Sequence, residues 1–221
     1  MTIRAKLVTA IVVAVTGLAL TAGVGIWGMN RLGDKFDAVQ SAGEARALAL
    51  ELKYDITDFN GWQTAYGYDN GGSRPIFLGS VAHFRAHLAR ARARLTTPAE
   101  QKNLDDIEAA FNDFMALDAT AYQALQAGRE DAVRRIFLGP EIANFQRAAA
   151  GAQRLATLEA ARAAATGKAF KDARSDALRL LILASIVAAI LVALLLVTAF
   201  DLARAAERTL ASSPPPDEPA G

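Results

Sequence analysis

Two long apolar runs bracket a charged middle segment of the chain. The first run covers residues 7–29 and the second covers residues 180–200, and neither contains a charged side chain. At a helical rise of about 1.5 Å per residue these runs reach roughly 34 and 31 Å, which matches a hydrocarbon core of about 30 Å. The pattern therefore predicts two transmembrane helices.

The first run has to be distinguished from a secretory signal peptide, because Arg4 and Lys6 precede it. The apolar core of a signal peptide ends after about 7 to 15 residues, and its cleavage site needs small side chains. Here the apolar character continues past Leu20 to Trp27, and Leu20 itself occupies the position two before Ala22. We therefore predict an uncleaved membrane anchor.

Basic residues in the short flanks predict the orientation of both helices. Positive charges precede the first run, and Arg204 and Arg208 follow the second. Because such flanks stay on the cytoplasmic side, we expect a two-pass protein of the inner (cell) membrane with cytoplasmic segments at 1–6 and 201–221. The second of these is expected to be a short disordered tail, since it ends in a run of prolines. Residues 30–179 then form an extracytoplasmic domain.

Apolar residues of this domain recur at alternating steps of three and four, the spacing that places side chains on one face of a helix. The predicted stripes are Ala45, Leu48, Leu52, Asp55, Phe59, Trp62 and Tyr66; Phe77, Val81, Phe84, Leu88, Ala91 and Leu95; Leu104, Ile107, Phe111, Phe114, Asp118, Ala121 and Leu125; and Ile142, Phe145, Ala152, Leu155 and Leu158. Strand signals are absent from the sequence. We therefore predict an all-α fold, in which an antiparallel four-helix bundle is flanked by the two transmembrane helices.

Turn and capping residues separate these stripes. Residues 70–72 (Asn-Gly-Gly) favour a turn with positive φ, and Ser73 is a candidate cap for the next helix. Residues 97–100 have the pattern of a capping box with proline at the first helical position. Gly128 is expected to end the third helix, and the Gly139–Pro140 pair to interrupt the entry into the fourth.

The composition argues against several classes of function. The net charge is +1 with both signs interspersed, which argues against a nucleic-acid binder. The chain has no cysteine, so disulfides and thiol chemistry are excluded. Motifs for nucleophilic catalysis, phosphate binding or metalloproteases are also missing. We expect neither an enzyme nor a cofactor.

The densest group of aromatic and amide side chains lies in residues 58–69. Asn60, Trp62, Gln63 and Tyr66 are the candidate ligand-binding residues here, because pockets between bundle helices combine aromatic rings with a few polar groups. The alternative is structural: Trp62 and Tyr66 at i and i+4 fill the bundle core.

Asp55 and Asp118 interrupt the apolar stripes of the first and third helices. A carboxylate in such a position is costly unless it is paired or close to water. One possibility is a polar, ligand-binding pocket that also includes Tyr122 and Gln63. The other is that the helices rotate to expose the carboxylates, or that an arginine reaches across from a neighbouring helix. The arginines considered for that role are Arg85, Arg92 and Arg147.

His83 and His87 are the only histidines, and their i, i+4 spacing is one that can bind zinc. A third ligand is not indicated by any motif. We therefore predict a solvated helix face and no metal site.

The anchor, bundle and second anchor together resemble the sensor half of methyl-accepting chemotaxis proteins with a four-helix-bundle ligand domain. The resemblance covers residues 2–200 and is carried by N-G-W-Q-T-A-Y at 60–66 and I-F-L-G-P-E-I at 136–142. It implies a homodimeric receptor for a small molecule, in which ligand binding shifts one transmembrane helix relative to the other.

In that family the signal continues into a cytoplasmic HAMP coiled coil and a signalling hairpin. Only 21 residues follow the second apolar run, so we expect neither module. The chain is then expected to act as a homodimer or as a heterodimer with full-length chemoreceptors. The alternatives are a structural or scaffolding membrane protein, or a truncated receptor remnant that acts only through dimerisation.

Overall fold

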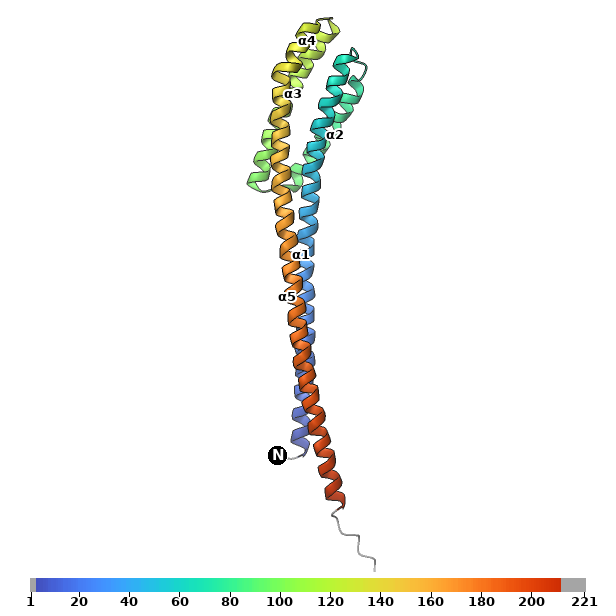
Figure 1. Cartoon of the computed structure of the whole chain (residues 1–221), viewed down its shortest axis with the longest axis vertical. Coiled ribbons are helices and arrows are strands. Elements are labelled where there is room, and N and C mark those ends of the chain that lie inside the picture. The colour runs from blue at the N-terminus through green and yellow to red at the C-terminus, as the bar shows by residue number, and fades with distance from the viewer. Residues whose placement is uncertain (1–2, 212–221) are drawn as a thin grey trace, which may run out of the picture. The chain divides into compact units, whose positions relative to one another are not determined.

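A computed structural model describes residues 3–211 of the chain, and within this range it contains helices and turns but no strand. The elements are α1 (Ile3–Tyr68), α2 (Arg74–Arg94), α3 (Pro98–Gln126), α4 (Glu130–Ile136), the π-helical turn η1 (Phe137–Glu141) and α5 (Ile142–Ala211) (Figure 1). The predicted all-α class is confirmed. The short helix α4 was not predicted.

The chain divides into two compact units. Unit 1 contains the described residues 3–36 and 169–211, and unit 2 contains residues 37–168. Within Ile11–Tyr68 and Glu130–Ala205 the chain has helices long and apolar enough to cross a membrane. The lengths and compositions are thus those expected of a membrane protein.

Unit 1 pairs one segment of α1 with one segment of α5 along small side chains. Gly17 and Gly28 are buried. A Cβ atom at Gly17 would lie 3.2 Å from the Leu191 side chain, and one at Gly28 would lie 3.5 Å from Ala177 Cβ. Large apolar side chains cover the outer surface, and they include Val12, Leu18, Ile26, Ile182, Ile190 and Leu196. Close packing through glycine with an apolar exterior is typical of helices in a lipid bilayer.

Helix α5 does not end with the second apolar run. Residues 201–211 continue it as helix, although they were expected to belong to the disordered tail. The physical reason is their content of alanine, leucine and arginine, which have high helix propensity. The prolines of the predicted tail lie outside the described residues.

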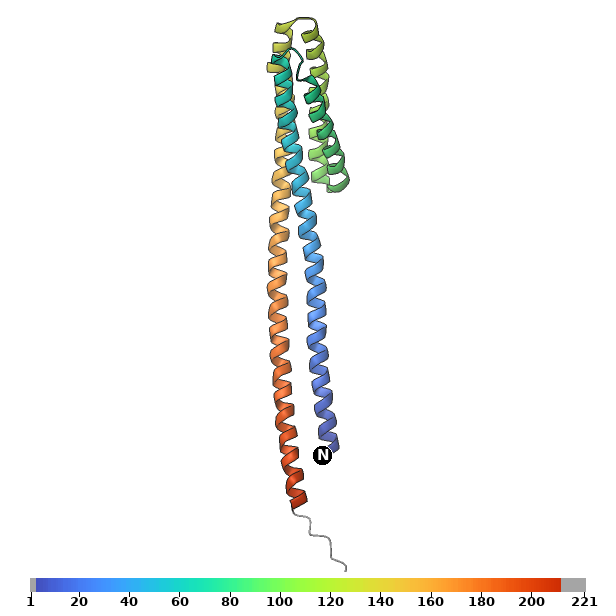
Figure 2. The same ribbon diagram turned by 90° about the vertical axis from the view of Figure 1, so that its right-hand side faces the viewer.

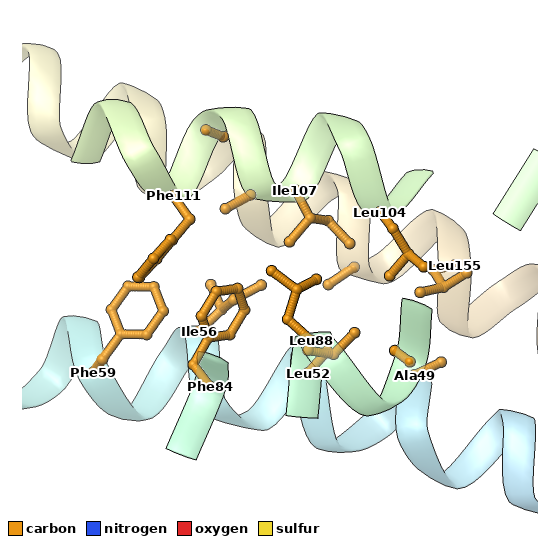
Figure 3. Packing of buried hydrophobic residues seen from close by; sticks show 14 of the residues in the cluster. Ala49, Leu52, Ile56, Phe59, Phe84, Leu88, Leu104, Ile107, Phe111 and Leu155 are labelled. Carbon is orange, nitrogen blue, oxygen red and sulfur yellow. The ribbon is translucent and has the colours of Figure 1, made fainter. Parts of the chain in front are cut away.

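Unit 2 has a hydrophobic core to which α1, α2, α3 and α5 all contribute. Figure 3 shows Leu104 and Ile107 of α3 directed toward Leu52 and Leu88 of α1 and α2. Phe59 packs against the rings of Phe84, Phe111 and Phe114 at centroid distances of 5.5, 5.6 and 5.1 Å. The predicted stripes of the first three helices are buried, apart from the partly buried Trp62 and Leu125.

The fourth stripe was only partly right. Ile142 and Leu158 are exposed to 40% and 36%, and the buried face of α5 instead includes Ala148 and Glu159. Steps of three and four place either residue 158 or residue 159 on the stripe after Leu155. The sequence analysis assigned Leu158 to the stripe because its side chain is apolar, whereas the structure buries Glu159.

The breaks between helices follow local chemistry. Asn70 and Gly71 have φ of 53° and 94°, as expected for the turn. Thr97 and Glu100 form the predicted capping box, and Gly128 ends α3 with φ of 66°. Ser73 does not cap α2, because its hydroxyl donates to Asp69 Oδ2 at 2.5 Å.

Figures 1 and 2 show the α1–α2 turn, in teal, and α4 with η1, in yellow-green, at the same end of unit 2. In η1 the backbone is non-helical at Gly139, with φ of −112° and ψ of −107°, and Pro140 follows within the turn. The expected interruption of the helix thus takes the form of a kink through which the chain passes into α5.

Candidate functional site

A group of polar side chains is buried in unit 2 near the α1–α2 turn. We call it the Asp118 cluster, and its members are Gln63, Tyr66, Arg74, Asp118, Tyr122 and Glu141. The members on α1 and α3 have helical i, i+3 and i, i+4 spacing, so each pair shares one face. Arg74 is the first residue of α2, and Glu141 is the last residue of η1.

Asp118 and Arg74 form a two-pronged ion pair at the centre of the cluster. Nη1 of Arg74 donates to Oδ1 at 2.7 Å, and Nη2 lies 2.7 Å from Oδ2. The Asp118 side chain is 0% exposed and that of Arg74 only 15%. The hydroxyl of Tyr66 also donates to Oδ1. Burial lowers the pKa of Arg74, but the Asp118 carboxylate outweighs this and raises it.

Aromatic rings surround the Arg74 guanidinium. Its Cζ lies 4.8 Å from the centroid of Tyr66, 4.9 Å from that of Phe77 and 4.4 Å from that of Tyr122. These distances are within the range of cation–π attraction, which strengthens when the cation loses water. Burial raises the pKa of the Tyr66 hydroxyl, and Asp118 adds to this, so the hydroxyl remains a donor.

Glu141 lies beside the ion pair and is 1% exposed. The side-chain amide of Gln63 donates to its Oε1, whereas Oε2 has no hydrogen-bond partner. Burial raises the pKa of Glu141 to about 8, with the Asp118 charge adding to the effect and Gln63 and Arg74 opposing it. Glu141 therefore carries a proton near neutral pH, and the cluster holds one cation against one carboxylate.

The remaining predicted site residues lie elsewhere. Asp55 is bonded to His87, whose Nδ1 is 2.6 Å from Oδ2. Asn60 is half-buried and takes no part in the cluster, and Trp62 packs against the apolar core. Of the predicted residues, the structure brings together Gln63, Tyr66, Asp118 and Tyr122.

The arginines expected to neutralise the buried carboxylates were the wrong ones. Arg85 lies over the Phe111 ring at 5.5 Å. Arg92 binds Asp105 and Glu108, and Arg147 binds Asp113. Arg92 and Arg147 thus pair with acids on α3, and Arg85 stacks on an aromatic ring, so none of the three contacts Asp55 or Asp118.

Of the two histidines, His87 contacts the Asp55 carboxylate and His83 is exposed. Within residues 3–211 no group of acidic and histidine side chains has the arrangement of a metal centre. Burial raises the pKa of Asp55, and His87 opposes this effect. The Asp55–His87 pair thus joins α1 to α2.

Arg74 and Glu141 were missed by the sequence analysis. Arg74 lies between the predicted turn with Ser73 and a proline, and it belongs to none of the predicted apolar stripes. Glu141 follows the Gly139–Pro140 pair and precedes the predicted fourth stripe. One signal was available: Glu141 precedes Phe145 by four residues and Ala148 by seven, which is the spacing of the buried face of α5.

The arrangement is suited to recognition of a charged group. A carboxylate with surrounding aromatic faces is the environment in which proteins bind organic cations, and a guanidinium fork is the usual partner of a carboxylate ligand. In this structure the Arg74 guanidinium and the Asp118 carboxylate are paired with each other. Comparison with protein-family models, with curated proteins and with solved structures finds no match for this chain.

Proposed function

We propose that this protein is a membrane-anchored sensory protein of the chemotaxis-receptor type, which binds a small molecule or a partner outside the membrane. The observation that carries the proposal is the Asp118 cluster. A buried ion pair is often replaceable by apolar side chains without loss of stability, so packing alone does not require it. A cation and a carboxylate inside a helical unit are the groups with which a receptor would bind a charged ligand.

The proposed architecture is an antiparallel four-helix bundle between two transmembrane helices, with the bundle outside the inner membrane and both termini in the cytoplasm. The common core of α1, α2, α3 and α5 supports the bundle. The apolar exterior of unit 1 and the two candidate spans support the membrane location. The basic flanks of the apolar runs support the orientation.

Signalling in this proposal starts with competition for the ion pair. A ligand that pairs with Arg74 or Asp118 loosens the contact between the start of α2 and the middle of α3. Tyr66 of α1 is held by the same carboxylate, so the change also reaches α1. Helix α1 includes the first candidate span, and the resemblance implies that ligand binding shifts one transmembrane helix relative to the other.

We further propose that the protein works as a dimer, with itself or with a full-length receptor. A stripe on α1 remains open to pairing: Gly43, Ala47, Leu50, Tyr54 and Gly61 are all exposed. Leu50 and Tyr54 are 47% and 69% exposed, and no atom lies within 4 Å of a Cβ placed at Gly43 or Gly61. These positions alternate in steps of three, four and seven, the spacing of a helix–helix seam.

The test is thermal unfolding of the full chain in lipid nanodiscs, with a library of amino acids, amines and small carboxylates. A ligand of the folded state raises the midpoint by mass action. Asp118→Asn should abolish that rise, whereas Asp113→Asn should retain it, because Asp113 is an exposed acid on the same helix. A library that shifts neither the wild type nor the control variant contradicts the ligand-binding proposal.

A scaffolding role is the second candidate, and the full burial of Tyr66 within an aromatic core favours it. In that case substitutions in the Asp118 cluster lower stability or dimerisation without affecting any ligand response. A folded Asp118→Asn variant that has lost a ligand response of the wild type would contradict the scaffolding role.

A further inference from the structure

A second pair of buried acids lies in unit 2, outside the Asp118 cluster. Glu100 is in the first turn of α3 and is 1% exposed, and Glu159 is on the buried face of α5 and is 0% exposed. Both carboxyl groups lie near the same atom, Arg162 Nη1, which is 2.6 Å from Glu100 Oε1 and 3.9 Å from Glu159 Oε2, and each carboxyl group acts on the pKa of the other. Two buried carboxylates in contact repel strongly unless a proton or cation lies between them.

Glu100 is supplied with donors. The Thr97 backbone N–H donates to Oε2 at 2.7 Å, which completes the capping box. Arg162 Nη1 donates to Oε1 at 2.6 Å. Burial acts to raise the pKa of Glu100, but the Thr97 N–H, Glu159 and Arg162 together lower it. Glu100 is therefore the ionised member of the pair.

Glu159 lacks such donors. Both of its carboxyl oxygens are buried without a hydrogen-bond partner in the described structure. Arg162 Nη1 is 3.9 Å from Oε2, which is too long for a hydrogen bond. The charged groups that act on Glu159 are Glu100 from α3 and Arg162 from α5, and no charged group of α1 or α2 is among them.

We propose that Glu100 and Glu159 form a proton-binding site, in which Glu159 carries the proton and donates it in a hydrogen bond to Glu100. The site then holds one carboxylate, one carboxylic acid and one guanidinium. Its net charge is zero. Glu100 accepts from Thr97, Arg162 and Glu159, and the hydroxyl of Glu159 is satisfied. Deprotonation breaks the O–H bond, leaves the electron pair on Glu159 and releases the proton to water.

The charge of Glu159 changes near neutral pH. Burial raises the pKa of Glu159 to about 7, Glu100 adds to this, and Arg162 opposes it. The proton joins the first turn of α3 to α5, the helix that also contains the second apolar run. Its release leaves two carboxylates facing each other across that contact. A change of pH thus acts on the packing of α3 against α5, whether or not the Asp118 cluster binds a ligand.

The experiment is infrared spectroscopy of the full chain in nanodiscs, which detects the C=O stretch of protonated carboxyl groups. Glu159→Gln should remove one component of this band, and the wild-type component should disappear as pH rises through about 7. Glu141→Gln identifies the contribution of the other buried acid. Glu130→Gln, at an exposed acid of unit 2, should leave the band unchanged.

A second variant decides the question even where Glu159→Gln fails to fold. Arg162 is 48% exposed, and its charge favours the ionised pair. Arg162→Gln should therefore move the disappearance of the band component to higher pH, which a purely structural role for the arginine would not do. A band component that survives Glu159→Gln, or a midpoint that stays in place or moves down in Arg162→Gln, would overturn the proposal.

Discussion

Removal of the Arg74 side-chain charge is the most direct perturbation of the Asp118 cluster. In Arg74→Met the Asp118 carboxylate loses both guanidinium contacts of 2.7 Å and keeps the Tyr66 hydroxyl as its remaining donor. The carboxylate is fully buried, so water cannot replace the lost donors. An uncompensated charge in such a position is the main expected consequence of the substitution.

The expected cost is about 3–5 kcal/mol, the range measured when one partner of a buried ion pair is removed. The three cation–π contacts of Arg74 disappear at the same time and place the effect toward the upper end. In a unit the size of residues 37–168 this corresponds to a fall in the thermal midpoint of about 10 °C or more. Combining Arg74→Met with Asp118→Asn removes both charges and should restore about 1–3 kcal/mol of that loss.

The assay is thermal unfolding in nanodiscs, followed by circular dichroism at about pH 7. Arg147→Met is the matched control, because this arginine pairs with Asp113 at the surface, where an ion pair is worth about 1 kcal/mol or less. Equal midpoints for Arg74→Met and Arg147→Met would refute the reasoning. So would strict additivity of the Arg74 and Asp118 substitutions, to within about 0.5 kcal/mol.

Three further predictions use the same unfolding assay. The folded-state pKa of Glu141 is raised from 4.5 to about 8, so the free energy of unfolding should fall as pH rises from about 4.5 through 8, by at most about 5 kcal/mol. Glu141→Gln should remove this part of the pH dependence, and a variant whose free energy of unfolding changes with pH as in the wild type would refute the prediction. Gly151→Ala should cost about 1–3 kcal/mol, since its Cβ would lie 2.8 Å from the Ile107 side chain, whereas Gly167→Ala, where nothing lies within 4 Å, should be neutral or stabilising; equal effects would contradict the close approach. Thr97→Ala should cost about 0.5–2 kcal/mol by removing a helix cap, and a neutral result would contradict the capping box.

The apolar core of unit 2 was largely predictable from the sequence. Phe59, Phe84 and Phe111 sit on strict three-and-four spacings, and such large side chains have one favourable place in a helical unit, its interior. The turn at residues 70–72 and the capping box at Thr97 were also predictable, because local backbone chemistry alone specifies them.

The polar partners could not be predicted in the same way. Asp118 was recognisable because it interrupts an apolar stripe of its own helix. The identity of its partner depends on where the first turn of α2 lies against α3, which is a tertiary property that no spacing in the sequence encodes. Glu141 depends in addition on the non-helical backbone at Gly139, which sets the rotation with which the chain enters α5.

The buried face of α5 is informative in this respect, because an acid stands at each end of it. Glu141 and Glu159 enclose a seam of Phe145, Ala148, Ala152 and Leu155, with steps of three and four throughout. A helix that only had to pack would keep this seam apolar, since each buried carboxyl group without full hydrogen bonding costs stability. Both acids have raised pKa values, chiefly because they are buried, and both lie beside an acid of α3. We therefore expect the packing of α5 on α3 to depend on the charge at both ends of the seam, a property that the proposed sensory function requires and the alternative scaffolding role does not.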